Sequence, residues 1–261
     1  MTAKREVKVE PDDGGLVVRR RTELLSDGTY LFEDTLAIDG PLSATVITCE
    51  AWLVELYELK SGDLAFLSGN ESIAASTHKL GVLYPPFTIT QPRFTNVQGH
   101  LVGIAATGSL LEEFKSTPIL FDLAIAKAPP SVVEILEILR RGINRRAVPL
   151  NPRPSLLALR TKRLIDETYR AHPVIARIAQ RLGVTHEHLS RQFKCDFRLS
   201  PSAYLHKLRV ADAPLRLARG EEIVNVSQEV GYNDLSRFYK HFRNVTDSSP
   251  GACKKILRPR H

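Results

Sequence analysis

The sequence has few cysteines and no long apolar run, and each absence excludes a class of protein. Its three cysteines, Cys49, Cys195 and Cys253, lie far apart and form no CxxC pair, so a disulfide framework or a structural zinc site is not expected. No segment reaches the roughly 18 consecutive apolar residues of a membrane span, and the first residues lack the apolar stretch of a signal peptide. We therefore expect a cytoplasmic protein that contacts no membrane.

Motifs for metal binding and covalent catalysis are missing as well. The first half contains only His78 and His100, whereas a metal-dependent cupin needs a His-x-His cluster with a further carboxylate and histidine. His186 and His188 are two apart on an expected helix, so their side chains point away from each other. No Gly-x-Ser-x-Gly nucleophile motif occurs. We expect no metal, no cofactor and no enzymatic activity.

Positive charge is scarce in the first part of the chain and concentrated in the second. Residues 155–261 carry 20 Lys and Arg against 10 Asp and Glu, whereas residues 1–154 carry 16 against 19. The net charge of +7 is therefore the sum of a mildly acidic part and a strongly basic one. Such asymmetry indicates that one part meets a polyanion.

The first half has the pattern of an antiparallel barrel or sandwich, with short β-branched and aromatic runs between turn residues. Turns are expected at Asp39-Gly40-Pro41 and Ser61-Gly62-Asp63. The expected strands cover residues 16–18, 29–32, 44–48, 51–57, 81–84, 87–89 and 101–104. The large aromatic residues either line an apolar ligand pocket or form the core: Trp52, Tyr57, Phe66, Tyr84 and Phe87.

The hydrophobic period changes near residue 131. Apolar residues at helical spacing predict a helix that Ser131 caps, with Glu134 in its first turn and Arg140-Arg141 in its last. This helix either packs on the barrel or forms a dimer seam. Three prolines between residues 149 and 154 cannot continue a helix. We expect a strand-rich sensor or dimerisation domain at 1–144, a linker at 145–154 and a helical domain at 155–261.

The helical half contains an internal repeat. Residues 176–194 and 225–243 each show a short amphipathic helix, a tight turn and a second helix. In each copy a small residue, Ala179 or Ser227, precedes a glycine, Gly183 or Gly231, by four positions. The small residue lets two helices cross closely, and glycine tolerates the positive φ of the turn. This is the pattern of a helix-turn-helix, whose second helix enters the major groove.

Helical phasing assigns two faces to each second helix. Thr185 is expected to cap the first, and Asn233 or Asp234 the second. Leu189, Phe193, Phe238 and Phe242 are expected to point inward. The outward side chains are then His186, Glu187, Ser190, Arg191 and Lys194 in the first copy, and Ser236, Arg237, Tyr239, Lys240 and Arg243 in the second.

Four motifs in this half occur in order and without large gaps: 178–184, 188–194, 200–209 and 230–238. Through them, residues 157–256 resemble the C-terminal DNA-binding domain of the AraC/XylS family of transcription regulators. The resemblance implies two helix-turn-helix units joined by a long helix, which read two successive major-groove segments on one face of DNA. It also implies an N-terminal domain, often a cupin-like barrel, that senses a small molecule or dimerises.

The resemblance implies individual roles in DNA binding. It places base reading on Glu187, Ser190, Arg191, Ser236, Tyr239 and Lys240. Arg191 is the strongest candidate, because arginine can donate two hydrogen bonds to O6 and N7 of guanine. Phosphate contacts are expected from Thr185, Lys194 and Arg243, and Gly183 and Gly231 form the turns. The alternative for each side chain is an ordinary solvated helix face.

One departure from the family concerns Pro214, which lies where the connecting helix should be continuous. A proline inside a helix costs about 3 kcal/mol and kinks or breaks it. The sequence therefore leaves open how Pro214 affects the connecting helix between Ala203 and Arg219, and with it the angle between the two helix-turn-helix units.

Together these patterns predict an α+β protein of two domains, an N-terminal strand-rich domain (cupin-like barrel or sandwich) with a helix and a C-terminal all-α double helix-turn-helix domain. We expect a transcription regulator of the activator kind. Its expected partners are double-stranded DNA, RNA polymerase, a small-molecule effector and a second copy of the chain in a homodimer. The alternative is a purely structural N-terminal domain, with control by abundance or a protein partner. A DNA-repair enzyme is disfavoured because Cys49 has no neighbouring ligands.

Overall fold

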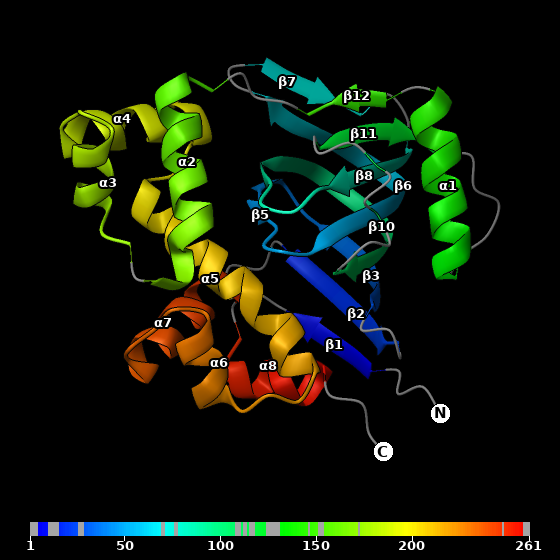
Figure 1. Ribbon diagram of the computed structural model, residues 1–261. Coiled ribbons are helices and arrows are strands. Elements are labelled where there is room, and N and C mark those ends of the chain that lie inside the picture. The colour runs from blue at the N-terminus through cyan, green and yellow to red at the C-terminus, as the bar shows by residue number, and fades with distance from the viewer. Residues whose placement is uncertain are drawn as a thin grey trace. The chain divides into compact units, whose positions relative to one another are not determined.

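The computed structural model describes residues 5–9, 16–25, 29–68, 71–75, 78–107, 111, 114, 118–123, 131–145, 147–150, 154–171, 173–246 and 248–257. The chain divides into two compact units. Unit 1 comprises Met1–Asn151 with Ile256–His261, and unit 2 comprises Pro152–Lys255. Unit 1 is built mainly of strands and unit 2 of helices, which confirms the predicted fold class (Figure 1).

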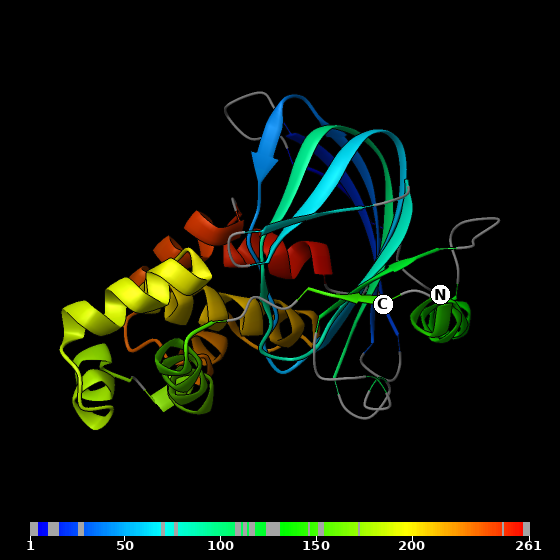
Figure 2. The same ribbon diagram turned by 90° about the horizontal axis from the view of Figure 1, so that it is seen from above.

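Unit 1 is organised around one large antiparallel sheet that curves strongly (Figure 2). Among the described residues the hydrogen-bonded path has two ends, β1 and β12, so these strands do not close into a barrel. Its order is β1 (Arg5–Val9), β2 (Leu16–Leu24), β3 (Tyr30–Ile38), β10 (Pro92–Ala106), β6 (Trp52–Ser68), β8 (Lys79–Tyr84), β11 (Ile119–Asp122) and β12 (Ala147–Pro149). The shorter strands are β4 (Pro41–Ser43) beside β10, β7 (Glu71–Ala74) beside β6, and the separate pair β5 (Val46–Ile47) and β9 (Ile89–Thr90).

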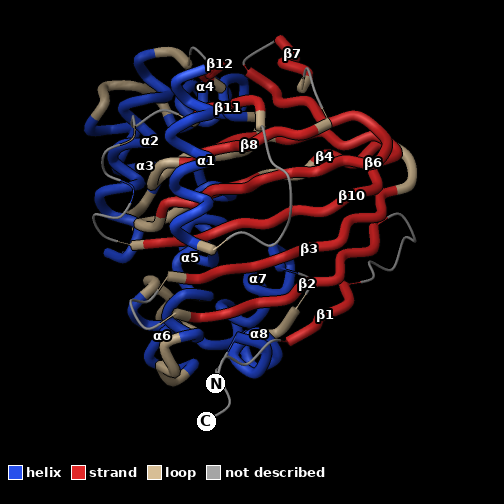
Figure 3. Tube along the Cα trace, turned by 90° about the vertical axis from the view of Figure 1, so that its right-hand side faces the viewer, coloured by secondary structure: helices blue, strands red, loops and turns tan. Residues whose placement is uncertain are grey.

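One face of the sheet packs on helix α1 (Val132–Arg145), which lies across it in Figure 3. Trp52, Val54 and Leu56 alternate along β6 and join the core beneath α1. The helix starts as predicted: the Glu134 carboxylate accepts a hydrogen bond from the Ser131 N–H at 2.6 Å, and Glu134 N donates to Ser131 Oγ at 3.3 Å. Of the two alternatives for this helix, the structure shows packing on the sheet.

The turn expected at Ser61-Gly62-Asp63 is wrong, because β6 runs through it without interruption. Gly62 takes a φ of +85°, and a Cβ there would lie 2.5 Å from the carbonyl oxygen of Thr95. The partner strand β10 shifts register between Thr95 and Gln98. A glycine opposite a β-bulge therefore bends the long strand instead of ending it.

The expected linker at 145–154 overlaps the sheet. Residues 147–149 form β12, whose Val148 is paired with Leu120 of β11. Pro149 is tolerated there because β12 is the last strand of the path, where a missing N–H breaks no inner ladder. Residues 146 and 151–153 lie outside the described residues.

Unit 2 consists of short helices arranged around a long one. They are α2 (Leu156–Thr168), η2 (Tyr169–Ala171), α3 (Ile175–Arg181), α4 (His186–Phe197), α5 (Pro201–Ala218), α6 (Ile223–Glu229), α7 (Leu235–Thr246) and α8 (Pro250–Leu257) up to Lys255. Helix α5 lies between the pair α3–α4 and the pair α6–α7 (Figure 1). This is the predicted arrangement of two helix-turn-helix units on one connecting helix.

Pro214 does not end α5, which continues to Ala218. The structure therefore decides what the sequence left open: the proline does not break the connecting helix. Apolar packing stabilises the helix on both sides of the proline, because Val210, Ala213 and Leu217 all lie in the core shared with α6 and α7. Tertiary contacts thus offset the hydrogen bond that the proline removes.

Candidate DNA-binding interface

The two helix-turn-helix units have the same turn geometry. Gly183 and Gly231 have φ values of +71° and +94°. In the first unit Val184 N donates to Ala179 O at 3.1 Å and Gly183 N donates to Gln180 O at 3.1 Å. These two bonds define a Schellman motif, in which glycine takes the left-handed position after the helix.

The second turn repeats these bonds at the equivalent positions. Tyr232 N donates to Ser227 O and Gly231 N to Gln228 O, both at 2.9 Å. The small residues that precede the glycines are almost completely buried, Ala179 at 1% and Ser227 at 2% exposure. A larger side chain at either position would meet the neighbouring helices, which explains the residue types shared by the two copies.

Each second helix begins at a side-chain cap. Thr185 Oγ1 accepts from His188 N at 3.2 Å at the start of α4. Asp234 Oδ1 accepts from Ser236 N at 2.7 Å and from Arg237 N at 3.1 Å at the start of α7. The structure therefore selects Asp234 over Asn233 as the cap.

The apolar faces of α4 and α7 point into the protein as predicted. Leu189 and Phe193 of α4 are fully buried, and so are Phe238 and Phe242 of α7. Phe193 packs against Tyr204 of α5 with 5.8 Å between ring centroids. Because these rings fix the rotation of each helix about its axis, the opposite faces are left to solvent.

The proposed DNA-contacting residues of α4 lie on its solvent side. Glu187, Arg191 and Lys194 are exposed and Ser190 is half-buried, while Thr185 is exposed at the N-terminus. Arg191 Nη2 lies 3.4 Å from His188 Nδ1. Hydrogen bonds from its own backbone N–H and from the Thr185 hydroxyl hold the pKa of the Glu187 carboxyl below its ordinary value. Glu187 is therefore a carboxylate, able to accept a hydrogen bond but repelled by phosphates.

The proposed contacts of α7 are arranged in the same way. Ser236, Lys240 and Arg243 are exposed, whereas Tyr239 is half-buried and its ring meets that of Phe238 edge-on at 6.3 Å. Tyr239 is therefore only partly available to a ligand. Each second helix thus offers a mixed polar and cationic surface, which suits base edges and phosphates.

Two polar clusters behind these helices were not predicted from the sequence. One joins Tyr169, Arg170, Asp212 and Arg216 across η2 and α5. The other brings His206 of α5 against His241 of α7, with ring centroids 3.9 Å apart and the ring planes tilted by 58°. Their residues lie far apart in the sequence, so no local pattern indicated either cluster.

Within the described part of the chain, no group of three or more His, Cys, Asp or Glu side chains could hold a metal ion. The helices in that part are also too short or too polar to cross a bilayer. Cys49 is buried, Cys195 is exposed on α4 and Cys253 is half-buried.

Residues 178–256 match a family model described as a helix-turn-helix domain. This stretch is an AraC-type helix-turn-helix domain.

Two curated relatives match about a third of this chain. The raffinose operon transcriptional regulatory protein of Pediococcus pentosaceus is 30% identical over 94 residues, 36% of this chain and 34% of that protein. The lactose operon transcription activator of Staphylococcus xylosus is 30% identical over 79 residues, 30% of this chain and 28% of that protein. The chain thus spans about a third of the length of the curated relatives that it matches.

Solved structures resemble the chain with low sequence identity. The C-terminal domain of AraT, a response regulator from Geobacillus stearothermophilus, is 24% identical and covers 40% of this chain and 87% of its own, with a TM-score of 0.38. ToxT from Vibrio cholerae is 11% identical and covers 83% of this chain and 98% of its own, with a TM-score of 0.48.

Proposed function

We propose that the protein is a sequence-specific DNA-binding transcription regulator of the activator type. The observation that carries the proposal is the AraC-type domain with its two copies of one turn geometry, each followed by a helix with an exposed cationic face. Base reading is assigned to Glu187, Ser190, Arg191, Ser236, Tyr239 and Lys240. Phosphate contacts are assigned to Thr185, Lys194 and Arg243. RNA polymerase is the partner through which an activator would act.

The decisive experiment is selection of bound duplexes from a random-sequence DNA library by the full chain. The expected result is an enriched sequence with two contacted segments. The full chain should bind this duplex about 10³-fold or more tighter than a scrambled one at two salt concentrations. Equal affinity for both duplexes at each salt concentration would contradict the proposal.

Within this function, we infer that unit 1 binds a small-molecule effector. The support is a buried polar cluster on the sheet face opposite α1. Tyr57 Oη donates to Glu55 Oε2 at 2.7 Å. The hydroxyl groups of Tyr84 and Thr90 are buried beside it, and the Tyr84 phenol interacts electrostatically with Glu55, Tyr57 and Thr90. Burial, together with the charge of Glu55, raises the pKa of Tyr57 and Tyr84 well above the ordinary value, so both phenols remain hydrogen-bond donors.

Thermal melting of the full chain against a metabolite panel tests this inference. A specific compound should raise the midpoint by mass action, and Glu55→Gln should abolish that rise. If no compound shifts the midpoint and transcription is constitutive, unit 1 is structural, and abundance or a protein partner exerts the control. Homodimerisation through unit 1 is checked by sedimentation of the same sample. The function as proposed includes no enzymatic step.

A further inference from the structure

Helix α5 contains a local defect in its hydrogen bonding. Pro214 has no N–H, so the carbonyl of Val210 loses its usual donor one turn earlier. Asp212 and Arg216 flank the proline, and Arg216 Nε donates to Asp212 Oδ1 at 3.3 Å. This i,i+4 ion pair spans the turn in which the backbone bond is missing.

The same carboxylate is held from the side of the first helix-turn-helix unit. Asp212 is 8% exposed. Its Oδ2 accepts from Arg170 Nη2 at 2.8 Å, from Arg170 Nε at 3.1 Å and from Tyr169 Oη at 3.0 Å. Tyr169 and Arg170 form η2, which immediately precedes α3. A buried carboxylate with a two-pronged arginine contact and a phenol donor has a well-defined position.

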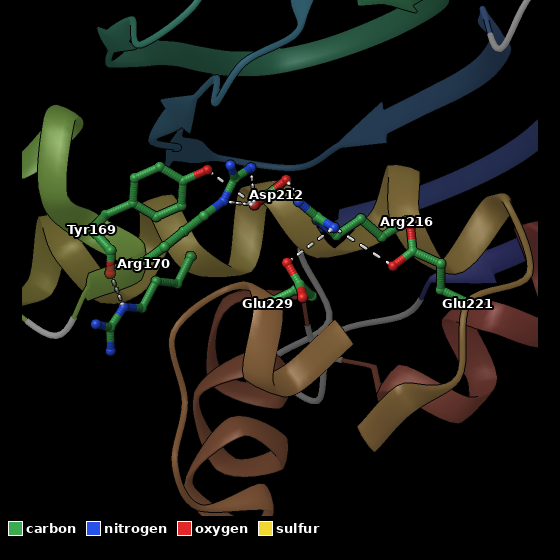
Figure 4. A network of polar contacts seen from close by, with 7 residues as sticks. Tyr169, Arg170, Asp212, Arg216, Glu221 and Glu229 are labelled. Atoms are coloured by element: carbon green, nitrogen blue, oxygen red, sulfur yellow. Dashed lines mark hydrogen bonds and ion pairs between the residues drawn. The ribbon is translucent and has the colours of Figure 1, made fainter. Parts of the chain in front are cut away.

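Arg216 extends the network to the second helix-turn-helix unit. Its Nη1 lies 3.5 Å from Glu221 and 4.0 Å from Glu229, the last residue of α6. Figure 4 shows the resulting chain of polar contacts from η2 through α5 to α6. We call Tyr169, Arg170, Asp212 and Arg216 the Asp212 network.

The second turn also packs directly on η2. A Cβ at Gly231 would lie 2.9 Å from the carbonyl oxygens of Tyr169 and Arg170. Arg209 donates from Nε to Tyr169 O at 2.8 Å, and its guanidinium lies 5.3 Å from the ring centre of Tyr232. The two helix-turn-helix units are therefore joined at a second place besides the backbone of α5.

We propose that the Asp212 network is a positioning device that fixes the separation and the angle of the two recognition helices. It thereby determines how many base pairs must separate the two DNA segments that one molecule reads. The inference rests on the proposed function. One inserted base pair moves the second segment by about 3.4 Å along the duplex and rotates it by about 35°. A rigid connection cannot follow this displacement, whereas a loosened one can.

The test uses the full chain and the duplex selected by the wild-type protein, with derivatives that carry one base pair more or less between the contacted segments. The wild type should lose roughly 100-fold in affinity on either derivative, because one of two linked contacts is lost. Asp212→Asn and Arg170→Gln should lose less than about tenfold on the same derivatives. The two variants should bind a duplex that contains only the first segment with the same affinity as the wild type.

Matched variants separate positioning from general destabilisation. Arg163→Gln removes an arginine that pairs with Glu167 within α2 at 2.8 Å and that is 81% exposed, so it should keep wild-type spacing discrimination. Pro214→Ala restores the backbone donor. The double variant Asp212→Asn, Pro214→Ala should therefore regain part of the spacing discrimination that Asp212→Asn loses. If Asp212→Asn does not fold, Arg170→Gln decides the question, because the Arg170 side chain is 34% exposed.

Two failures are distinguishable. If the wild type selects no sequence, the proposed function is wrong. If it does, and folded Arg170→Gln or Asp212→Asn protein discriminates spacing as sharply as the wild type, the positioning role of the Asp212 network is overturned.

Discussion

The two turn glycines share a conformation but not an environment. At Gly183 an added Cβ would meet nothing within 4 Å, whereas at Gly231 it would meet the carbonyl oxygens of Tyr169 and Arg170. Positive φ alone constrains the first position. The second is constrained both by φ and by close backbone packing, which cannot move aside as a flexible side chain would.

Alanine at these positions should therefore have unequal effects. Gly183→Ala should lower the free energy of unfolding by about 1–2 kcal/mol, the cost of a left-handed non-glycine residue. Gly231→Ala should lower it by about 3 kcal/mol or more, because strain and overpacking add. Urea denaturation of both variants checks this order. Equal losses would show that the contact with η2 contributes nothing.

Substitution of two basic residues of α4 should distinguish sequence-specific DNA binding from general affinity for DNA. Arg191→Ala is expected to cost about 1–3 kcal/mol on the selected duplex and little on scrambled DNA, because a base contact is lost. Lys194→Ala should weaken binding to both duplexes and reduce the slope of log affinity against log salt by about one. Titrations on both duplexes at several salt concentrations measure these effects. Equal losses for Arg191→Ala on both would exclude it as a base reader.

At the scale of elements, the start of α7 depends on one cap that periodicity alone could not assign. Asn233 and Asp234 are both exposed and both suitable in type, but only Asp234 accepts bonds from the first backbone N–H groups of α7. Phe238 and Phe242 then anchor the helix in the core. Capping and burial together define where the exposed face of α7 begins.

Asp234→Ala should destabilise the protein by about 1 kcal/mol, the usual cost of losing an N-cap. Asn233→Ala is the matched control, with the same exposure one position earlier, and should change stability by less than about 0.5 kcal/mol. Thermal denaturation of the two variants checks the difference. A larger loss for Asn233→Ala would mean that the cap is misassigned.

At the scale of the whole molecule, a pair of histidines links folding to pH. The Nδ1 atom of His206 is buried and has no hydrogen-bond partner among the described residues, and His241 Nδ1 lies 3.2 Å from Tyr232 Oη. Burial, with the charges of His241, Arg209 and Arg237, lowers the pKa of His206 from 6.5 to about 4. Burial also lowers the pKa of His241, together with Lys240 and the same two arginines.

Between pH 6.5 and about 4 the unfolded chain therefore binds more protons than the folded chain, because the folded pKa of His206 is the lower one. Stability should be complete above pH 6.5, fall as the pH drops through this window, and not change further through His206 below about pH 4. Denaturation curves of the wild type and His206→Gln across this range measure the effect. As the pH falls, the free energy of unfolding of His206→Gln should rise relative to that of the wild type. A constant difference would contradict the role of His206.

Local signals account for much of unit 2. The repeat at 176–194 and 225–243 predicted the order of helices, both turns and the buried positions Leu189, Phe193, Phe238 and Phe242. It did so because a glycine with positive φ and a helical apolar stripe are short-range requirements. The Asp212 network was inaccessible to such reasoning, since Arg170 and Asp212 lie 42 positions apart. The strand pattern likewise predicted β8 but not the long β6, whose bend at Gly62 depends on its partner strand.

The sequence by itself determined the paired helices of the repeat, the glycines of their two turns and the helix faces that carry cationic side chains. Periodicity and residue type decide these features within a few residues of the chain. Only the tertiary structure decided that α5 continues through Pro214, that η2 packs against the second turn and that Asp212 joins the two units. Each of these features depends on groups brought together from distant parts of the chain. Their burial and hydrogen bonding offset the backbone hydrogen bond that Pro214 removes, an effect that local sequence patterns do not reveal.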